Sequence, residues 1–187
     1  MATRNILKDG ERGLTKTSRP VTDYNKRLHD LLDDMRETLI EANGLGLAAP
    51  QVGVLRRAVL IVDTGKYETP PDEEGAELTE EQIAEKYNRS IIELINPEIT
   101  GKDGEQTGRE GCLSVPGVCG IVTRPNIVRF KAQDRYGKTF ELEVSELTAR
   151  AVCHEVDHLD GIIFTSVADR ILTEEELAEP EEENDKQ

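Results

Sequence analysis

The segment from residue 145 to residue 161 constrains the fold of this 187-residue chain most strongly, because it places two histidines on the apolar face of a helix. Its inward face carries residues at positions i, i+4, i+7 and i+11: Leu147, Ala151, His154 and His158. Ser145 fits the N-cap and Gly161 fits the position after the last turn. Since buried imidazole rings need polar partners, the rest of the chain must fold around this helix and supply them.

A second helix is predicted from Tyr24 to Asn43. Its apolar residues recur at spacings of three and four: Leu28, Leu31, Leu32, Met35, Leu39 and Ile40. Thr22 or Asp23 can cap its start, and Asn43 followed by Gly44 can end it.

The remaining periodic segments predict strands. A glycine-rich turn at 44–53 precedes a buried strand at 57–62, and a strand at 91–95 ends at Asn96-Pro97. Residues 127–132 and 138–144 alternate apolar and polar side chains around the turn at 134–137, which predicts a hairpin. We therefore expect an α+β fold with antiparallel or mixed strands packed around the central histidine-bearing helix, and the first helix on an outer face.

Charge excludes several classes of protein. The chain has 38 acidic and 23 basic residues, a formal net charge of −15, which disfavours binding to DNA, to RNA phosphates or to anionic membranes.

Its longest aliphatic run, 58–62, is too short to cross a bilayer, and the N-terminus lacks a signal-peptide pattern. Three cysteines are too few for a disulfide framework, so a reducing, cytosolic compartment is expected.

The acidic residues are concentrated in two segments. Residues 63–89 hold nine acidic and three basic residues, and residues 173–187 hold eight and one. We expect one domain over 1–172 with 63–89 as an acidic surface insertion, in which Thr79 and Gln82 start a short helix, followed by a disordered acidic tail at 173–187.

The sharpest chemical pattern is His154-Glu155-Val156-Asp157-His158. Histidines four residues apart on a helix can converge on one metal ion, and Glu155 between them can act as a base. The third ligand stays open at this point. Carboxylates downstream of His158 would suit another metallopeptidase, whereas Cys112 in the turn-rich segment 109–117 is a better upstream candidate. A noncatalytic metal-binding or redox-sensing protein is the third alternative.

Three segments together resemble the peptide deformylase family: Gly44-Leu-Gly-Leu-Ala-Ala-Pro-Gln51, Glu110-Gly-Cys-Leu-Ser114 and His154-Glu-Val-Asp-His158. They match its three signature motifs in order, and the resemblance extends from about Leu7 to Ala168. The two acidic segments lie outside it.

The resemblance implies a metal site and a set of catalytic groups. Cys112, His154 and His158 would bind one divalent ion, Fe2+ first, with Zn2+, Ni2+ or Co2+ as substitutes. Glu155 would take a proton from the attacking water and pass it to the leaving amine. The site's oxyanion donors would be the side-chain amide of Gln51 and the backbone N–H of Leu113.

The implied reaction is hydrolysis of the N-formyl group from the initiator methionine of new polypeptides, with release of formate. An extended substrate would run beside Gly46, Glu110 and Gly111, with Leu45 as a wall for the methionine side chain. The implied setting is the bacterial cytoplasm, transiently near the ribosome. The acidic tail is not expected to dock there, because RNA would repel it.

Four other reactive side chains receive structural interpretations. We expect Cys153 to pack within the helix interface, Cys119 to lie in a turn, and Asp157 to form a salt bridge or structural hydrogen bond. His29 is expected at the surface.

Overall fold

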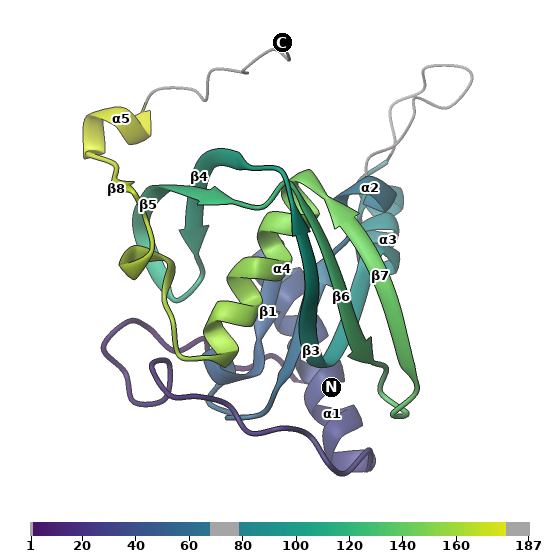
Figure 1. Cartoon of the computed structure of the whole chain (residues 1–187). Coiled ribbons are helices and arrows are strands. Elements are labelled where there is room, and N and C mark those ends of the chain that lie inside the picture. The colour runs from purple at the N-terminus through teal and green to yellow at the C-terminus, as the bar shows by residue number, and fades with distance from the viewer. Residues whose placement is uncertain (1, 68–78, 179–187) are drawn as a thin grey trace.

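Two antiparallel sheets enclose a central helix in the computed structural model, which describes residues 2–67 and 79–178 (Figure 1). The larger sheet has the order β1 (Gly46–Ala48), β2 (Ala58–Val62), β3 (Ile91–Asp103), β6 (Ile127–Gln133) and β7 (Thr139–Ser145). The smaller has the order β4 (Gln106–Cys112), β5 (Val115–Arg124) and β8 (Arg170–Ile171). Helix α4 (Glu146–Leu159) lies between them, and α1 (Lys26–Ala42) covers the other face of the large sheet. The predicted α+β class is confirmed.

Shorter helices complete the described part of the chain. They are η1 (Ala49–Val52), α2 (Thr64–Tyr67), α3 (Glu80–Ser90), η2 (Phe164–Ser166) and α5 (Glu174–Ala178). None of the helices within residues 2–67 and 79–178 is long and apolar enough to cross a membrane.

Strand β2 is buried on both faces, which explains its unbroken apolar run. Leu60 and Val62 pack toward α1, whereas Val59 and Ile61 pack toward α4. A third apolar cluster, which includes Leu14, lies under the small sheet. The sheet-and-helix sandwich therefore holds α4 from several sides, and this rigid setting positions the histidines.

The start of α1 differs from the prediction. Neither Thr22 nor Asp23 caps it; the side chain of Asn25 accepts hydrogen bonds from the backbone N–H groups of Arg27 and Leu28. Residues 21–24, which precede the cap, have no regular secondary structure. The predicted end is correct, because Asn43 adopts the left-handed conformation with φ 49°.

The predicted break at Asn96-Pro97 is wrong. Strand β3 continues through it, and its register with β6 shifts between Ile95 and Glu98, as at a β-bulge. Asn96 has φ 51°, and its side chain accepts from the N–H of Val21 at 2.8 Å and donates to the carbonyl of Val21 at 2.9 Å. The sequence signal for a turn thus marks a bulge that anchors the segment before α1.

The region around the first two cysteines is a hairpin rather than turns. Cys112 ends β4, and Cys119 lies within β5 opposite Gly111. Likewise, the glycine-rich segment 44–53 contains β1 and η1 as well as turns. These glycine-rich strands lack the alternation of apolar and polar side chains that predicts a strand, and hydrogen bonds between the backbones hold them together. The hairpin β6–β7 has the predicted position.

The acidic insertion is only partly a surface feature. Its central residues 68–78, and residues 179–187 of the predicted tail, lie outside the described residues. Thr79 and Gln82 form the predicted capping box of α3. Tyr87, however, packs in the α1-side core and donates hydrogen bonds to the carbonyls of Leu39 and Gly44. In the predicted tail, residues 174–178 form the exposed helix α5.

Candidate metal centre and active site

The structure brings the three predicted metal ligands together. The side-chain donor atoms of Cys112, His154 and His158 all lie within 4.8 Å of one another, and Cys112 Sγ lies 3.2 Å from His158 Nε2. Helix α4 presents both histidines on one face, and the end of β4 delivers the cysteine. A sulfur with two imidazole nitrogens suits a borderline transition metal such as ferrous iron or zinc.

The His154 ring is oriented by a buried carboxylate. His154 Nδ1 donates to Glu110 Oε2 at 3.0 Å, which leaves Nε2 as the free ligand nitrogen. Burial raises the pKa of Glu110, but hydrogen bonds from His154 and Arg124 outweigh it and lower that pKa to about 2. Glu110 is therefore ionised and acts on His154 as a fixed acceptor.

Two buried arginines hold Glu110 in turn. Arg124 donates to both carboxylate oxygens, at 2.9 and 3.1 Å, and Arg150 donates to Oε1 at 3.0 Å. Arg124 also pairs with Asp157 at 2.7 Å, so the predicted structural role of Asp157 is confirmed. The sequence reasoning missed both arginines. The one available signal was that Arg150 precedes His154 by four residues and therefore shares its helix face.

Glu155 lies buried beside the cluster. Its Oε2 atom has no hydrogen-bond partner among the described residues, and burial raises its pKa to about 7. A Cβ atom on Gly46 would lie 2.5 Å from Glu155 Oε1, so this glycine provides the space that the carboxylate occupies. A buried carboxylate with one oxygen left without a partner in the described part of the chain, next to three converging ligand atoms, fits a site built for an ion and a water molecule.

The orientation of the Gln51 amide follows from its contacts. The N–H of Ala48 donates to Gln51 Oε1 at 2.8 Å, which turns Nε2 toward Ser114 Oγ at 3.2 Å and Cys112 Sγ at 3.5 Å. The donor end of Gln51 therefore faces the ligand cluster. Gln51 is almost completely buried, so this orientation is held firmly.

A pocket of about 410 Å³ opens onto these groups. Its lining includes all the predicted substrate contacts together with Leu113: Leu45, Gly46, Glu110 and Gly111. The Glu110 carboxylate is already engaged by the arginines and His154, so any contact that it makes with a substrate must use its backbone. Val115, Leu147 and Ala151 add apolar surface. The pocket suits an extended peptide with an apolar side chain.

The remaining reactive side chains lie away from this cluster. Cys153 is buried in the core on the sheet side of α4, as predicted. His29 is partly buried near the β6–β7 turn, where its Nε2 lies 2.8 Å from the carbonyl of Arg135. Neither contributes to the candidate centre.

Comparison with known proteins decides the family. A family model described as "Polypeptide deformylase" matches residues 3–174. The chain is 48% identical to a peptide deformylase of Caldicellulosiruptor bescii over 186 residues, covering 100% of this chain and 98% of the relative. It is 44% identical to peptide deformylase 1 of Bacillus subtilis, covering 97% and 99%. This chain belongs to the peptide deformylase family.

Solved deformylase structures agree with this assignment. The peptide deformylase of Thermotoga maritima has a TM-score of 0.74 at 28% identity and covers 90% of this chain and 99% of that one. An actinonin-bound class I type b enzyme from Acinetobacter baumannii has a TM-score of 0.73 at 30% identity, with 90% and 100% covered. Peptide deformylases are metal-dependent hydrolases that remove the N-formyl group from nascent polypeptides, and neither alternative function is supported.

Proposed function

We propose that this chain deformylates N-formylmethionyl peptides with one divalent ion held by Cys112, His154 and His158. The observation that carries the proposal is the convergence of these three donor atoms beside the buried carboxylate of Glu155, whose Oε2 atom has no hydrogen-bond partner among the described residues. A bound ion would supply Lewis acidity and a water molecule that ionises near neutral pH. The protein's own side chains would supply the proton transfer and the positioning.

Glu155 is the proposed general base and acid. Its carboxylate accepts one proton as water adds to the formyl carbon, and returns it to the nitrogen as the C–N bond breaks. The cleavage gives formic acid and the free amine of methionine, and transfer of the acid proton to the amine leaves formate and an ammonium group, so atoms and charge balance. A pKa raised by burial to about 7 suits a group that must both take and give a proton.

Gln51 and Leu113 are the proposed oxyanion donors. The Nε2 end of Gln51 faces the ligand cluster, and Leu113 directly follows Cys112 along the chain. These positions support a role for both groups in donating hydrogen bonds to a formyl oxygen that gains negative charge beside the ion. Fixed donors of this kind need no reorganisation during the reaction.

The substrate backbone is proposed to run beside Gly46, Glu110 and Gly111. All three line the 410 Å³ pocket, and Leu45 adds an apolar wall for the methionine side chain. Support comes from a relative, because a class I type b deformylase of Acinetobacter baumannii has been solved with Met-Ala-Ser bound.

Fe2+ is the proposed ion, with Zn2+, Ni2+ or Co2+ able to replace it. The thiolate and imidazole donors suit all four, so the choice of iron rests on the family resemblance. Residues 1–172 are proposed to form one catalytic domain, with 63–89 as an insertion and 173–187 as an acidic tail. The proposed setting is the bacterial cytoplasm with transient approach to the ribosome, for which the acidic tail is not the contact.

Formate release tests the proposed function directly. Protein prepared anaerobically with Fe2+ is incubated with formyl-Met-Ala-Ser, and formate is quantified beside a parallel reaction with chelator-treated protein. Formate production that is lost on chelation and restored by Fe2+, Ni2+ or Co2+ is the expected result. Absence of formate with every ion would contradict the proposal, and so would equal cleavage of unformylated Met-Ala-Ser into its amino acids.

A further inference from the structure

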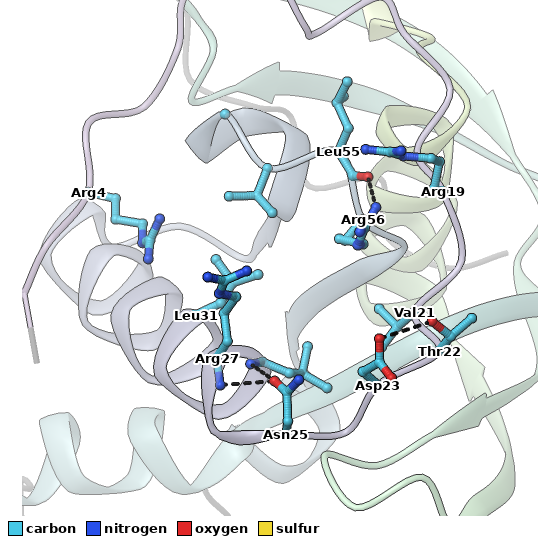
Figure 2. Close-up of a pocket in the computed structure, with 13 residues that line it drawn as sticks. Arg4, Arg19, Val21, Thr22, Asp23, Asn25, Arg27, Leu31, Leu55 and Arg56 are labelled. Atoms are coloured by element: carbon cyan, nitrogen blue, oxygen red, sulfur yellow. Dashed lines mark hydrogen bonds between the residues drawn. The ribbon is translucent and has the colours of Figure 1, made fainter.

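A second pocket, separate from the catalytic one, lies where the N-terminal segment meets the start of α1. It has a volume of about 580 Å³ and shares no lining residue with the pocket at the ligand cluster. Its walls come from Arg4, seven residues in the range 19–28, Leu31 on α1 and the loop at 53–56 (Figure 2). This size is typical of small-molecule sites.

Four arginines line this second pocket. Figure 2 shows Arg4 and Arg27 on one side, and Arg19 and Arg56 on the other. Among the described residues that line it, Asp23 supplies the single carboxylate, so these residues carry a formal charge of +3. Such a concentration is unexpected in a chain whose net charge is −15.

Three of these guanidinium groups lack acidic partners among residues 2–67 and 79–178. Arg4 pairs with Asp34 at 2.9 Å, but Arg19 and Arg27 have no side-chain partner there, and Arg56 reaches only the carbonyl of Leu55 at 3.5 Å. By contrast, most arginines elsewhere in the described chain form ion pairs: Arg36, Arg57, Arg89, Arg124, Arg129, Arg135, Arg150 and Arg170. With carboxylates in excess, unpaired arginines at one concave place point to an external anion.

The rest of the lining is mixed, with the polar side chains of Thr22, Asp23 and Asn25 beside apolar ones. Five apolar side chains contribute to it: Val21, Leu28, Leu31, Val54 and Leu55. Val21, Leu28 and Leu31 are buried in the core, which fixes the position of this side of the pocket. A simple inorganic ion would use the arginines and leave this apolar surface uncovered. A ligand with both an anionic group and an apolar group matches the arginines and the apolar side chains together.

We propose that this pocket binds a small phosphorylated ligand of the nucleotide class, with its phosphates among Arg19, Arg27 and Arg56 and its base against the apolar residues. Planar guanidinium groups bind phosphate oxygens in pairs, and arginine suits this better than lysine. Two or more phosphates can span arginines on opposite sides of the pocket. This site is independent of the deformylation chemistry.

Isothermal titration of the metal-loaded protein with ADP tests the proposal. Arg19→Gln and Arg27→Gln, singly and combined, remove charge but keep hydrogen-bonding capacity. The matched control is Arg129→Gln, because Arg129 is an exposed arginine paired with Glu143 on the β6–β7 hairpin. Since ADP also chelates metals, the comparison with Arg129→Gln separates pocket binding from chelation at the catalytic ion. Formate release should be unchanged in all four variants.

The expected result is ADP binding that weakens about tenfold or more in the double variant and less than about twofold in the control. Pyrophosphate should bind more weakly than ADP, and adenosine more weakly still. Equal ADP affinity in the wild type and the double variant would overturn the proposal. Binding of adenosine as tight as that of ADP would do the same, as would binding of a single-stranded RNA oligonucleotide without binding of ADP.

Discussion

At the scale of single residues, the close approach of Gly46 and Glu155 links the first motif to the third. The Cβ of an alanine at position 46 would lie 2.5 Å from Glu155 Oε1 and 2.7 Å from its Cγ. Because Glu155 is buried at the centre of the site, its carboxylate has little room to move aside. The Glu155 side chain alone therefore requires glycine at position 46, independently of any contact between Gly46 and the substrate.

Gly46→Ala should lower kcat about hundredfold, because the displaced carboxylate would no longer meet the reacting atoms. Steady-state formate release measures the change. Gly65→Ala is the matched control, since its Cβ would lie at an ordinary 3.5 Å from the nearest atom and should leave kcat unchanged. A Gly46→Ala enzyme with wild-type kcat would show that the contact has no bearing on catalysis.

Glu110→Gln should weaken metal binding about 10- to 100-fold, since the charged acceptor that orients His154 is lost. Competition of the protein with a chelator for Co2+ measures the affinity without reference to activity. Glu143→Gln, which alters an exposed ion pair with Arg129, serves as control. Unchanged Co2+ affinity in Glu110→Gln would rule out this positioning role.

The residues that belong to short motifs could be predicted from the sequence. The residues that support those motif residues through buried contacts could not. Cys112, His154 and Glu155 stand in recognisable patterns, whereas Arg124 and Arg150 resemble ordinary surface arginines until the fold buries them against Glu110. Buried ion pairs between distant segments leave no local periodicity. Their partners become visible only when β4, β5 and α4 are assembled.

At the scale of elements, periodicity predicted the structure wherever one face of an element is buried. Helix α1 and the β6–β7 hairpin were predicted for this reason, whereas strand β2, which is buried on both faces, was predicted from its unbroken apolar run. The β4–β5 hairpin was missed because its glycines and Pro116 resemble turns, while backbone pairing makes the strands. The bulge in β3 was missed because Asn96-Pro97 carries the same signal as a strand end.

Asn96→Ala should lower the free energy of unfolding by about 2 kcal/mol, since it removes two hydrogen bonds to Val21 and places alanine at a positive φ. Urea denaturation followed by circular dichroism measures the difference. Asn5→Ala, at an exposed asparagine, is the control. Equal stability of the wild type and Asn96→Ala would mean that the bulge does not anchor the segment before α1.

At the scale of the whole molecule, most of the net negative charge and the three motifs that form the site lie in different parts of the sequence. Residues 63–89 and 173–187 carry −6 and −7 of the net −15, whereas the three motifs lie in the nearly neutral remainder. The ligand cluster, its supporting arginines and the catalytic pocket all lie between residues 44 and 158. Overall acidity therefore says little about the reaction.

A chain that ends at Ala178 should keep its formate release and its Tm, because the site and the described core lie upstream. The deletion removes five acidic residues and one lysine, which changes the net charge from −15 to −11. Thermal unfolding and kinetics on the shortened chain measure both quantities. A large drop in kcat/KM would assign residues 179–187 a part in catalysis.

The central claim is that Glu155 moves the proton at an ion held by Cys112, His154 and His158. Formate release by Glu155→Gln, loaded with one ion per chain and compared with equally loaded wild type, tests it most directly. The predicted result is a loss of about 100- to 10,000-fold in kcat with metal content unchanged. A Glu155→Gln enzyme that releases formate at the wild-type rate would contradict it.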